Sequence, residues 1–128
     1  MSSLSNAVPV SFVLTADRAS ATHFYANMLG LPIADEDDFA VTFTLAGGAL
    51  MRLTQVESHS AGMHTVLGWN VANILETVVG LRAVGVDFRV YDGMGQDDNG
   101  IWTAPGGAAK VAWFSDPDGN VLSLQQFG

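Results

Sequence analysis

Arg52 is the side chain whose setting points most directly to chemistry. It stands in the run Leu50-Met51-Arg52-Leu53, which places a permanent positive charge among apolar neighbours. A guanidinium offers five donors in a fixed fork and stays charged at any useful pH. In a partly dry site it needs an anion, a carbonyl or a carboxylate, because an unpaired buried charge is costly. We therefore expect Arg52 to contact a ligand or, alternatively, an internal acid.

The other side chains capable of chemistry form no recognisable motif. His59 and His64 lie at the end of an expected linker and His23 falls in an expected helix, but no carboxylate is paired with them at a known spacing. The chain has no cysteine, which excludes disulfides, thiol catalysis and cysteine-based zinc sites. Neither a Ser-His-Asp order nor a phosphate-binding loop is present. The catalytic residues, if there are any, stay unknown at this point.

The elements that would position Arg52 occur twice along the chain. Residues 17–30 predict a helix that begins at a capping Asp and ends at Gly, and residues 73–85 repeat this pattern with Asn and Gly. Each copy then closes with a strand that opens at a glycine. The fourth residue after that glycine is Arg52 in the first copy and Ser123 in the second. Such a repeat implies two copies of one supersecondary unit that share a core.

Each copy is expected to hold a strand, a helix and three further strands. The expected strands of the first copy are 9–14, 33–34, 39–45 and 49–55, with Gly47–Gly48 as a two-residue hairpin. Those of the second copy are 65–71, 86–91, 110–114 and 121–126, with a glycine-rich, structureless loop over 92–107. The sequence predicts an α+β fold in one domain, residues 1–128. Its two βαβββ modules, about 8–56 and 63–127, would form an open curved mixed sheet, or cup, with the helices outside.

Composition restricts the partners. The net charge of -8 and the scatter of only five basic residues disfavour nucleic acid. No apolar run approaches the ~20 residues that span a bilayer, and residues 1–6 lack a signal pattern, so we expect no membrane and a cytoplasmic protein. Hydrophobic residues make up 48% of the chain, and an open cup would leave some of them exposed. We expect a homodimer to cover them.

Two motifs resemble those of the vicinal oxygen chelate superfamily, which includes glyoxalase I, extradiol dioxygenases, fosfomycin-resistance enzymes and bleomycin-binding proteins. The first is Asp17-x6-Phe24-Tyr25-x3-Leu29-Gly30-Leu31, and the second is Phe114-x-Asp116-Pro117-Asp118-Gly119-Asn120. The resemblance extends over nearly the whole chain. It implies paired βαβββ modules in an open cup, usually within a homodimer.

The same resemblance implies a departure at the metal site. Metal-dependent members carry His, Glu, Gln or similar ligands at four strand positions, which correspond here to Val10, Arg52, Val66 and Ser123. A valine has no donor atom, and an arginine repels a divalent cation. One serine hydroxyl cannot hold a metal alone. We therefore expect no metal and no cofactor.

Strand parity predicts which side chains face the cup. In the first module these are Val10, Phe12, Leu14, Leu50, Arg52 and Thr54, with Phe43 beside Arg52 if the hairpin has two residues. In the second they are Val66, Gly68, Asn70, Ser123 and Gln125, with Phe114 added if four residues separate the closing pair of the final turn. Trp69 and Trp113 fall on the opposite parity, beneath the helices, and Trp102 is either a lid or a loop anchor. The predicted ligand-binding residues are Arg52, Phe12, Phe43, Thr54, Asn70, Trp102, Phe114, Ser123 and Gln125.

An apolar bowl with one cation and a few neutral polar groups is typical of a small-molecule site. We predict a metal-independent protein that binds a small organic ligand with an anionic or carbonyl-bearing group. One alternative is a metal-free enzyme of isomerase, lyase or hydrolase type that uses Arg52 to stabilise an oxyanion. Another is a drug-sequestering resistance protein for a cationic ligand, which the charge of -8 suggests. The sequence leaves open the ligand's identity and whether the protein is catalytic.

Overall fold

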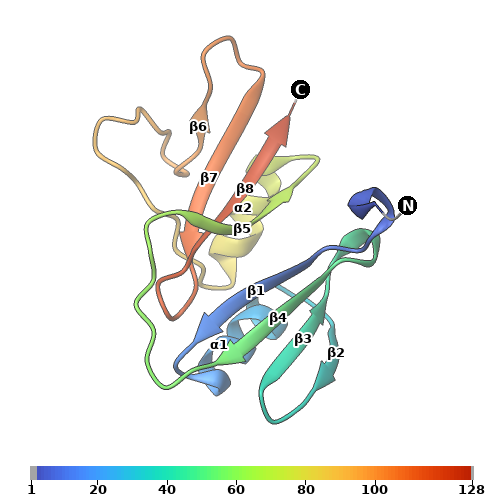
Figure 1. Cartoon of the computed structure of the whole chain (residues 1–128). Coiled ribbons are helices and arrows are strands. Elements are labelled where there is room, and N and C mark those ends of the chain that lie inside the picture. The colour runs from blue at the N-terminus through green and yellow to red at the C-terminus, as the bar shows by residue number, and fades with distance from the viewer. Residues whose placement is uncertain (1–2, 128) are drawn as a thin grey trace. The chain divides into compact units, whose positions relative to one another are not determined.

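A computed structural model describes residues 3–127, and these residues form two four-stranded sheets, each built from one repeat (Figure 1). The chain divides into two compact units between His59 and Ser60. The α+β fold with two related modules is therefore confirmed. Within residues 3–127, every helix is too short or too polar to cross a bilayer.

The first unit follows the predicted order of a strand, a helix and three strands. Its elements are η1 (Leu4–Asn6), β1 (Val10–Thr15), α1 (Arg18–His23), η2 (Phe24–Met28), β2 (Ile33–Glu36), β3 (Ala40–Thr44), η3 (Ala46–Gly48) and β4 (Leu50–Gln55). The sheet order is β1-β4-β3-β2, with β1 parallel to β4 and the other pairs antiparallel. The helical segment lies against one face of this sheet (Figure 1).

The first helix forms where the capping signal predicts it. The Asp17 side chain accepts a hydrogen bond from the backbone N–H of Ser20 at 3.2 Å. After His23 the helix widens into the π-helical turn η2, in which Leu29 N donates to Phe24 O at 2.9 Å. Tyr25 is fully buried and contacts the Phe43 ring, with centroids 5.9 Å apart. This helix face and the inner side of β3 therefore form the core of the unit.

The second unit repeats the topology. Its elements are β5 (Thr65–Asn70), α2 (Ile74–Ala83), β6 (Trp102–Thr103), β7 (Ala109–Ser115) and β8 (Val121–Phe127). The order is β5-β8-β7-β6, again with the first and last strands parallel. Asn73 caps α2 by accepting from Glu76 N at 3.1 Å, and the Gln126 side chain accepts from Ile74 N at 2.8 Å. The second cap ties the start of the helix to the end of β8.

The predicted strand over 86–91 is wrong, and the predicted loop over 92–107 contains β6. The former segment meets the sheet at an isolated bridge, Phe88 to Phe114, and through Arg89, whose backbone N–H donates to the Trp113 carbonyl at 2.7 Å. The Gln96 amide explains this, because it donates to the carbonyls of Arg89 and Gly100 at 2.9 and 2.7 Å and accepts from Tyr91 N at 2.7 Å. These backbone groups bind a side chain instead of a neighbouring strand.

Both hairpins have a register one residue away from the predicted one. Thr44 and Leu50 are the last pair of the first hairpin, and Ser115 and Val121 are the last pair of the second, so residues 45–49 and 116–120 are the closing loops. A slip of one residue moves every side chain of a strand to the other face. Thr42, not Phe43, lies opposite Arg52, and Trp113, which lies opposite Ser123, occupies the face on which Phe114 was predicted.

The side-chain assignments change accordingly. Phe43 and Phe114 are fully buried on the helix side of their sheets, so they do not line the opposite faces as predicted. Trp113 instead shares a face with Ser123, which corrects its predicted place beneath a helix. Trp69 does lie on the helix side, where its ring stacks on that of Phe114 with centroids 6.3 Å apart.

Candidate functional site

The sheet face opposite the helix is called the open face of each unit. On the first open face, Arg52 of β4 lies between Phe12 of β1 and Thr42 of β3. The neighbouring residues Val10 and Leu14 share the Phe12 side of the strand, while Val13 between them is buried. This alternation places an arginine beside an exposed apolar strand.

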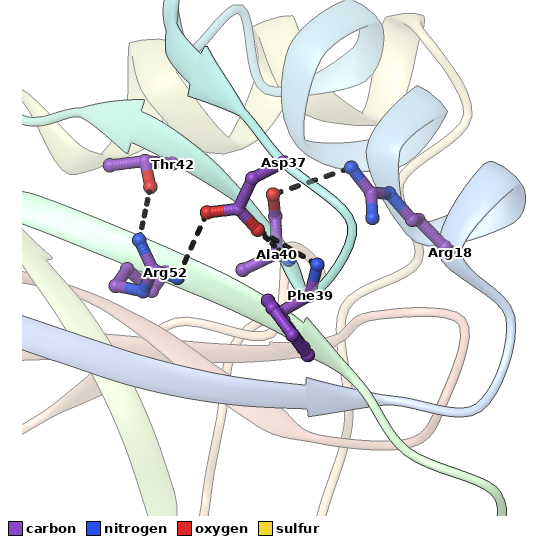
Figure 2. A network of polar contacts seen from close by, with 6 residues as sticks. All are labelled: Arg18, Asp37, Phe39, Ala40, Thr42 and Arg52. Carbon is purple, nitrogen blue, oxygen red and sulfur yellow. Dashed lines mark hydrogen bonds and ion pairs between the residues drawn. The ribbon is translucent and has the colours of Figure 1, made fainter.

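Arg52 is held by two neighbours (Figure 2). Its Nη1 donates to Thr42 Oγ1 at 3.1 Å, and its Nη2 lies 3.6 Å from Asp37 Oδ2. Asp37 lies in the loop between β2 and β3, within the acidic run 35–38 that begins at the end of β2. The internal acid expected as one alternative partner of Arg52 is thus present. The side chains of Arg52 and Asp37 are 33% and 43% exposed, so water screens the pair.

Backbone donors fix the position of Asp37. Its Oδ1 accepts from the N–H groups of Phe39 and Ala40 at 2.8 and 2.9 Å. These hydrogen bonds, followed by the Arg52 charge, hold the pKa of Asp37 below its ordinary value. The Ala40 carbonyl in turn accepts from Arg18 Nη2 at 3.3 Å (Figure 2). Asp37 is therefore a pre-positioned carboxylate that stays ionised at neutral pH.

Apolar side chains surround this charged pair. Phe12 is 65% exposed, and Val10 and Leu14 are about as exposed as a typical surface residue, at 40% and 38%. Leu50 and Thr54 on β4 are half-buried and share the face of Arg52. The predicted residues Arg52, Phe12 and Thr54 thus lie together on one face, and the first open face combines apolar surface with a guanidinium.

The second open face has different chemistry at the matching positions. Ser123 of β8 lies between Gly68 of β5 and Trp113 of β7. Gln125 lies two residues further along β8, between Asn70 and Val111. Trp102 of β6 pairs with Val111 and so completes this second row. The predicted residues Asn70, Trp102, Ser123 and Gln125 therefore share one face.

Three aromatic rings gather at the outer side of this face. The Trp113 ring meets the Tyr91 ring edge to face, with centroids 5.6 Å apart, and the Trp102 ring at a tilt, with centroids 6.4 Å apart. All three side chains are half-buried. Sequence reasoning missed Trp113 because it placed the final turn one residue short, and it missed Tyr91 because it assigned residues 86–91 to a strand. The signal lay in Asp116, whose Oδ1 accepts from the backbone N–H groups of Asp118 and Asn120 and so holds all five loop residues in one turn.

Gly68 is required beside the polar groups of the second open face. Ser123 Oγ donates to Gln125 Oε1 at 2.8 Å. A Cβ added at Gly68 would lie 2.6 Å from Ser123 Oγ and 2.9 Å from Gln125 Nε2, which is too close for either contact. The missing side chain therefore leaves the space in which Ser123 and Gln125 lie.

These residues do not fit a divalent metal. Arg52 is cationic and bound to Asp37, and the Ser123 hydroxyl is bound to Gln125. Among residues 3–127, no three side chains of the His, Cys, Asp or Glu type gather closely enough to hold an ion. His23, His59 and His64 accordingly form no such group within that range. Independence from metal remains a prediction from the residue types.

Comparisons with known proteins bear on the fold and the family. The model of the Glyoxalase/Bleomycin resistance protein/Dioxygenase superfamily matches residues 9–124. A search of curated proteins found no match. A lactoylglutathione lyase from Agrobacterium tumefaciens has a similar structure, with a TM-score of 0.72 and 15% identity over 94% of this chain and 93% of that chain.

Two further solved structures resemble the chain. A glyoxalase/bleomycin resistance protein/dioxygenase from Nocardioides has a TM-score of 0.68 and 16% identity, over 94% of this chain and 82% of that one. UcmS2 has a TM-score of 0.71 and 22% identity, over 92% of this chain and 96% of that one. At such identities the structural likeness establishes the fold, and activity has to be argued from the residues themselves.

Proposed function

Because the chain belongs to the Glyoxalase/Bleomycin resistance protein/Dioxygenase superfamily, we propose that it is a metal-independent member that binds a small organic ligand. One observation carries this proposal: the β4 position that would supply a metal ligand holds Arg52, whose guanidinium contacts Thr42 and Asp37. A fixed cation at this position disfavours a metal ion and favours an anionic or carbonyl-bearing ligand.

The first open face suits such a ligand. Asp37 pairs with Nη2 of the guanidinium through a long, half-exposed ion pair, and Thr42 accepts from Nη1. A guanidinium has five N–H donors, which is more than these two contacts require. Phe12 and Leu14 offer apolar contact beside it. A ligand that carries an apolar body and a carboxylate or carbonyl matches both features. The ligand's acceptor would add a charge-assisted hydrogen bond to those that Arg52 already makes.

The enzymatic alternative receives less support from this geometry. Oxyanion stabilisation by Arg52 would need a general base nearby, and Asp37 is the carboxylate in contact with it. Backbone hydrogen bonds lower the pKa of Asp37, so it is a weaker base than an ordinary aspartate at neutral pH. Ligand binding without turnover is the function that these contacts favour.

A titration with benzoate tests the proposal, because benzoate joins a carboxylate to an apolar ring. We expect saturable binding that is equal in the presence of EDTA and of one equivalent of Zn²⁺. Arg52→Met keeps the apolar stem and removes the charge, and it should weaken binding by about 1.5–3 kcal/mol, the value of a hydrogen bond to a charged group. Lys110→Met, which removes an exposed charge on β7, is the matched control. Binding that requires Zn²⁺, or that ignores Arg52→Met, would contradict the proposal.

We also propose the homodimer expected from the composition. Its support is the exposure of Phe39 in the loop before β3, at 74%. Such apolar surface is commonly covered by a second copy. Sedimentation equilibrium at micromolar concentration should give twice the chain mass of 13.5 kDa.

A further inference from the structure

The aromatic cluster of the second open face consists of Tyr91, Trp102 and Trp113, and it differs from a hydrophobic core because its rings are only partly buried. Tyr91, Trp102 and Trp113 come from three separate segments, yet their rings meet around Trp113. Each ring is half-buried, so each keeps surface available for contact, whereas the core ring of Phe114 on the reverse side of β7 has none. Partly exposed aromatic side chains with polar neighbours are typical of a binding surface.

The polar groups beside the cluster are neutral and oriented. Ser123 Oγ–H donates to Gln125 Oε1, which fixes the Gln125 amide with its Nε2 donors directed elsewhere. Within the described chain, residues 3–127, those Nε2 donors have no protein acceptor. Asn70, the neighbour of Gln125 on β5, is exposed and offers a second amide. The row therefore presents amide donors next to aromatic rings.

The charges on this face narrow the choice of ligand. The two rows of strand positions around Trp113 and Gln125 are occupied by Gly68, Asn70, Val111, Trp113, Ser123 and Gln125. None of these carries a charge, and the guanidinium beside them, that of Arg89, already donates to Ser115 Oγ and to the Gly119 carbonyl. A neutral molecule matches the surface better. Aromatic rings then favour a flat, unsaturated molecule, since stacking adds to the burial of apolar area.

We propose that the second open face is a binding site for a neutral, flat heteroaromatic molecule. The molecule stacks against the exposed indole surface of Trp113 and Trp102, and its edge carbonyl or ring nitrogen accepts a hydrogen bond from Gln125 Nε2. Gly68 is part of the site because its missing Cβ allows Ser123 to hold the Gln125 amide. The proposal rests on the proposed small-molecule function and names the ligand class for this face.

Quinolin-2-one, a flat neutral lactam, is a suitable probe. The chain has three tryptophans, so the three indole N–H signals can be followed by NMR during the titration. We expect the Trp102 and Trp113 signals to shift with saturation, while Trp69 on the helix side of the sheet serves as an internal reference. Decahydroquinolin-2-one has the same lactam without the flat rings and should bind at least about tenfold more weakly, within the range of stacking contributions.

Variants localise the effect. Trp113→Leu should weaken quinolin-2-one binding by about tenfold, and Gln125→Leu by about threefold or more. Phe39→Leu removes an exposed aromatic ring from the first unit and should leave binding unchanged. If Trp113→Leu does not fold, Trp102→Leu carries the same test, because Trp102 lies on the short strand β6 at the sheet edge.

Four results would overturn the inference: equal affinity for the saturated lactam, equal shifts of all three indole signals, unchanged affinity in a folded Trp113→Leu or Trp102→Leu variant, or tighter binding of tetramethylammonium than of quinolin-2-one. The last would indicate a site for cations. Failure here is distinct from failure of the proposed function, because benzoate binding to Arg52 and its independence of Zn²⁺ are measured separately on the first unit.

Discussion

The two modules have the same strand order, but different side chains occupy the matching central row of each sheet. In the first, the central row reads Phe12, Arg52 and Thr42, so a large charged side chain stands beside a large aromatic one. In the second, the corresponding row reads Gly68, Ser123 and Trp113. The aromatic residue has moved from the first strand of the module to the third. The side chain on the last strand has changed from a cation to a hydroxyl.

The difference shows how a repeated backbone supports unlike chemistry. Arg52 requires a carboxylate, which the loop before β3 supplies through Asp37. Ser123 requires only an acceptor, which its own strand supplies through Gln125, provided that residue 68 has no side chain. The backbone fixes which residues are neighbours, and the volumes and charges of those neighbours decide what the face binds.

The largest expected effects test which side of each sheet is core. Phe43→Ala and Phe114→Ala should each lower the free energy of unfolding by about 3–5 kcal/mol, because both rings are fully buried. Phe12→Ala, at an exposed ring, should lower it by less than about 1 kcal/mol. Urea unfolding measures all three. Equal losses would contradict the contrast between the open and covered faces, and a larger loss for Phe12→Ala would mean that the two faces have been exchanged. If the alanine variants do not fold, leucine at the same positions gives the same ranking.

A smaller effect tests the space at Gly68. Gly68→Ala should destabilise the protein by about 1–3 kcal/mol, since the new methyl group would meet Ser123 and Gln125 at distances below 3 Å. Adding Ser123→Ala should restore part of the loss. Gly80→Ala in α2, where the added Cβ meets nothing within 4 Å, should instead stabilise by about 0.5–1 kcal/mol. A neutral Gly68→Ala would remove the proposed contrast between the modules.

The smallest effect concerns the charge pair of the first module. The pKa of Asp37 is lower in the folded protein than its ordinary value of 3.8, so its contribution to stability is present above that value and is lost as the pH falls through the folded pKa. Asp37→Asn keeps an oxygen that can accept from Phe39 and Ala40 but loses the ion pair with Arg52. We expect the melting temperature of Asp37→Asn to lie below that of the unchanged protein above pH 4, and the two values to converge below that pH. If the difference in melting temperature between the two proteins grew on acidification, the pKa of Asp37 would be raised and not lowered.

Much of this architecture could be predicted from local signals. The repeat and both helix starts follow from caps, glycines and apolar runs, because each of these acts over a few residues. The partner of Arg52 could not be identified, since Asp37 approaches through the path of the β2–β3 connection. The aromatic cluster could not be predicted either. Trp113 changes face when the register shifts by a single residue, and β6 consists only of Trp102–Thr103, which is too short to show a strand pattern.

The Gly47–Gly48 pair shows how a local signal misleads. Two adjacent glycines suggested a two-residue turn. They instead occupy the left-handed region within η3, at φ values of 72° and 84°, while Leu45 N donates to Ala49 O across the wider loop. Both interpretations use glycine's freedom, and they differ only in which outer residues close the loop.

The odd length of the two closing loops constrains how this gene can change. Residues 45–49 and 116–120 each join a pair of strands. One face of each pair is buried on the helix side, and the other is the open face. Loss or gain of one codon in either loop would interchange Thr42 with Phe43, or Trp113 with Phe114, across the sheet. Loss or gain of two codons would preserve the sides. Length variation in descendants of this sequence should therefore come in even steps at these two places, and single-codon indels should be rare survivors that carry a compensating bulge.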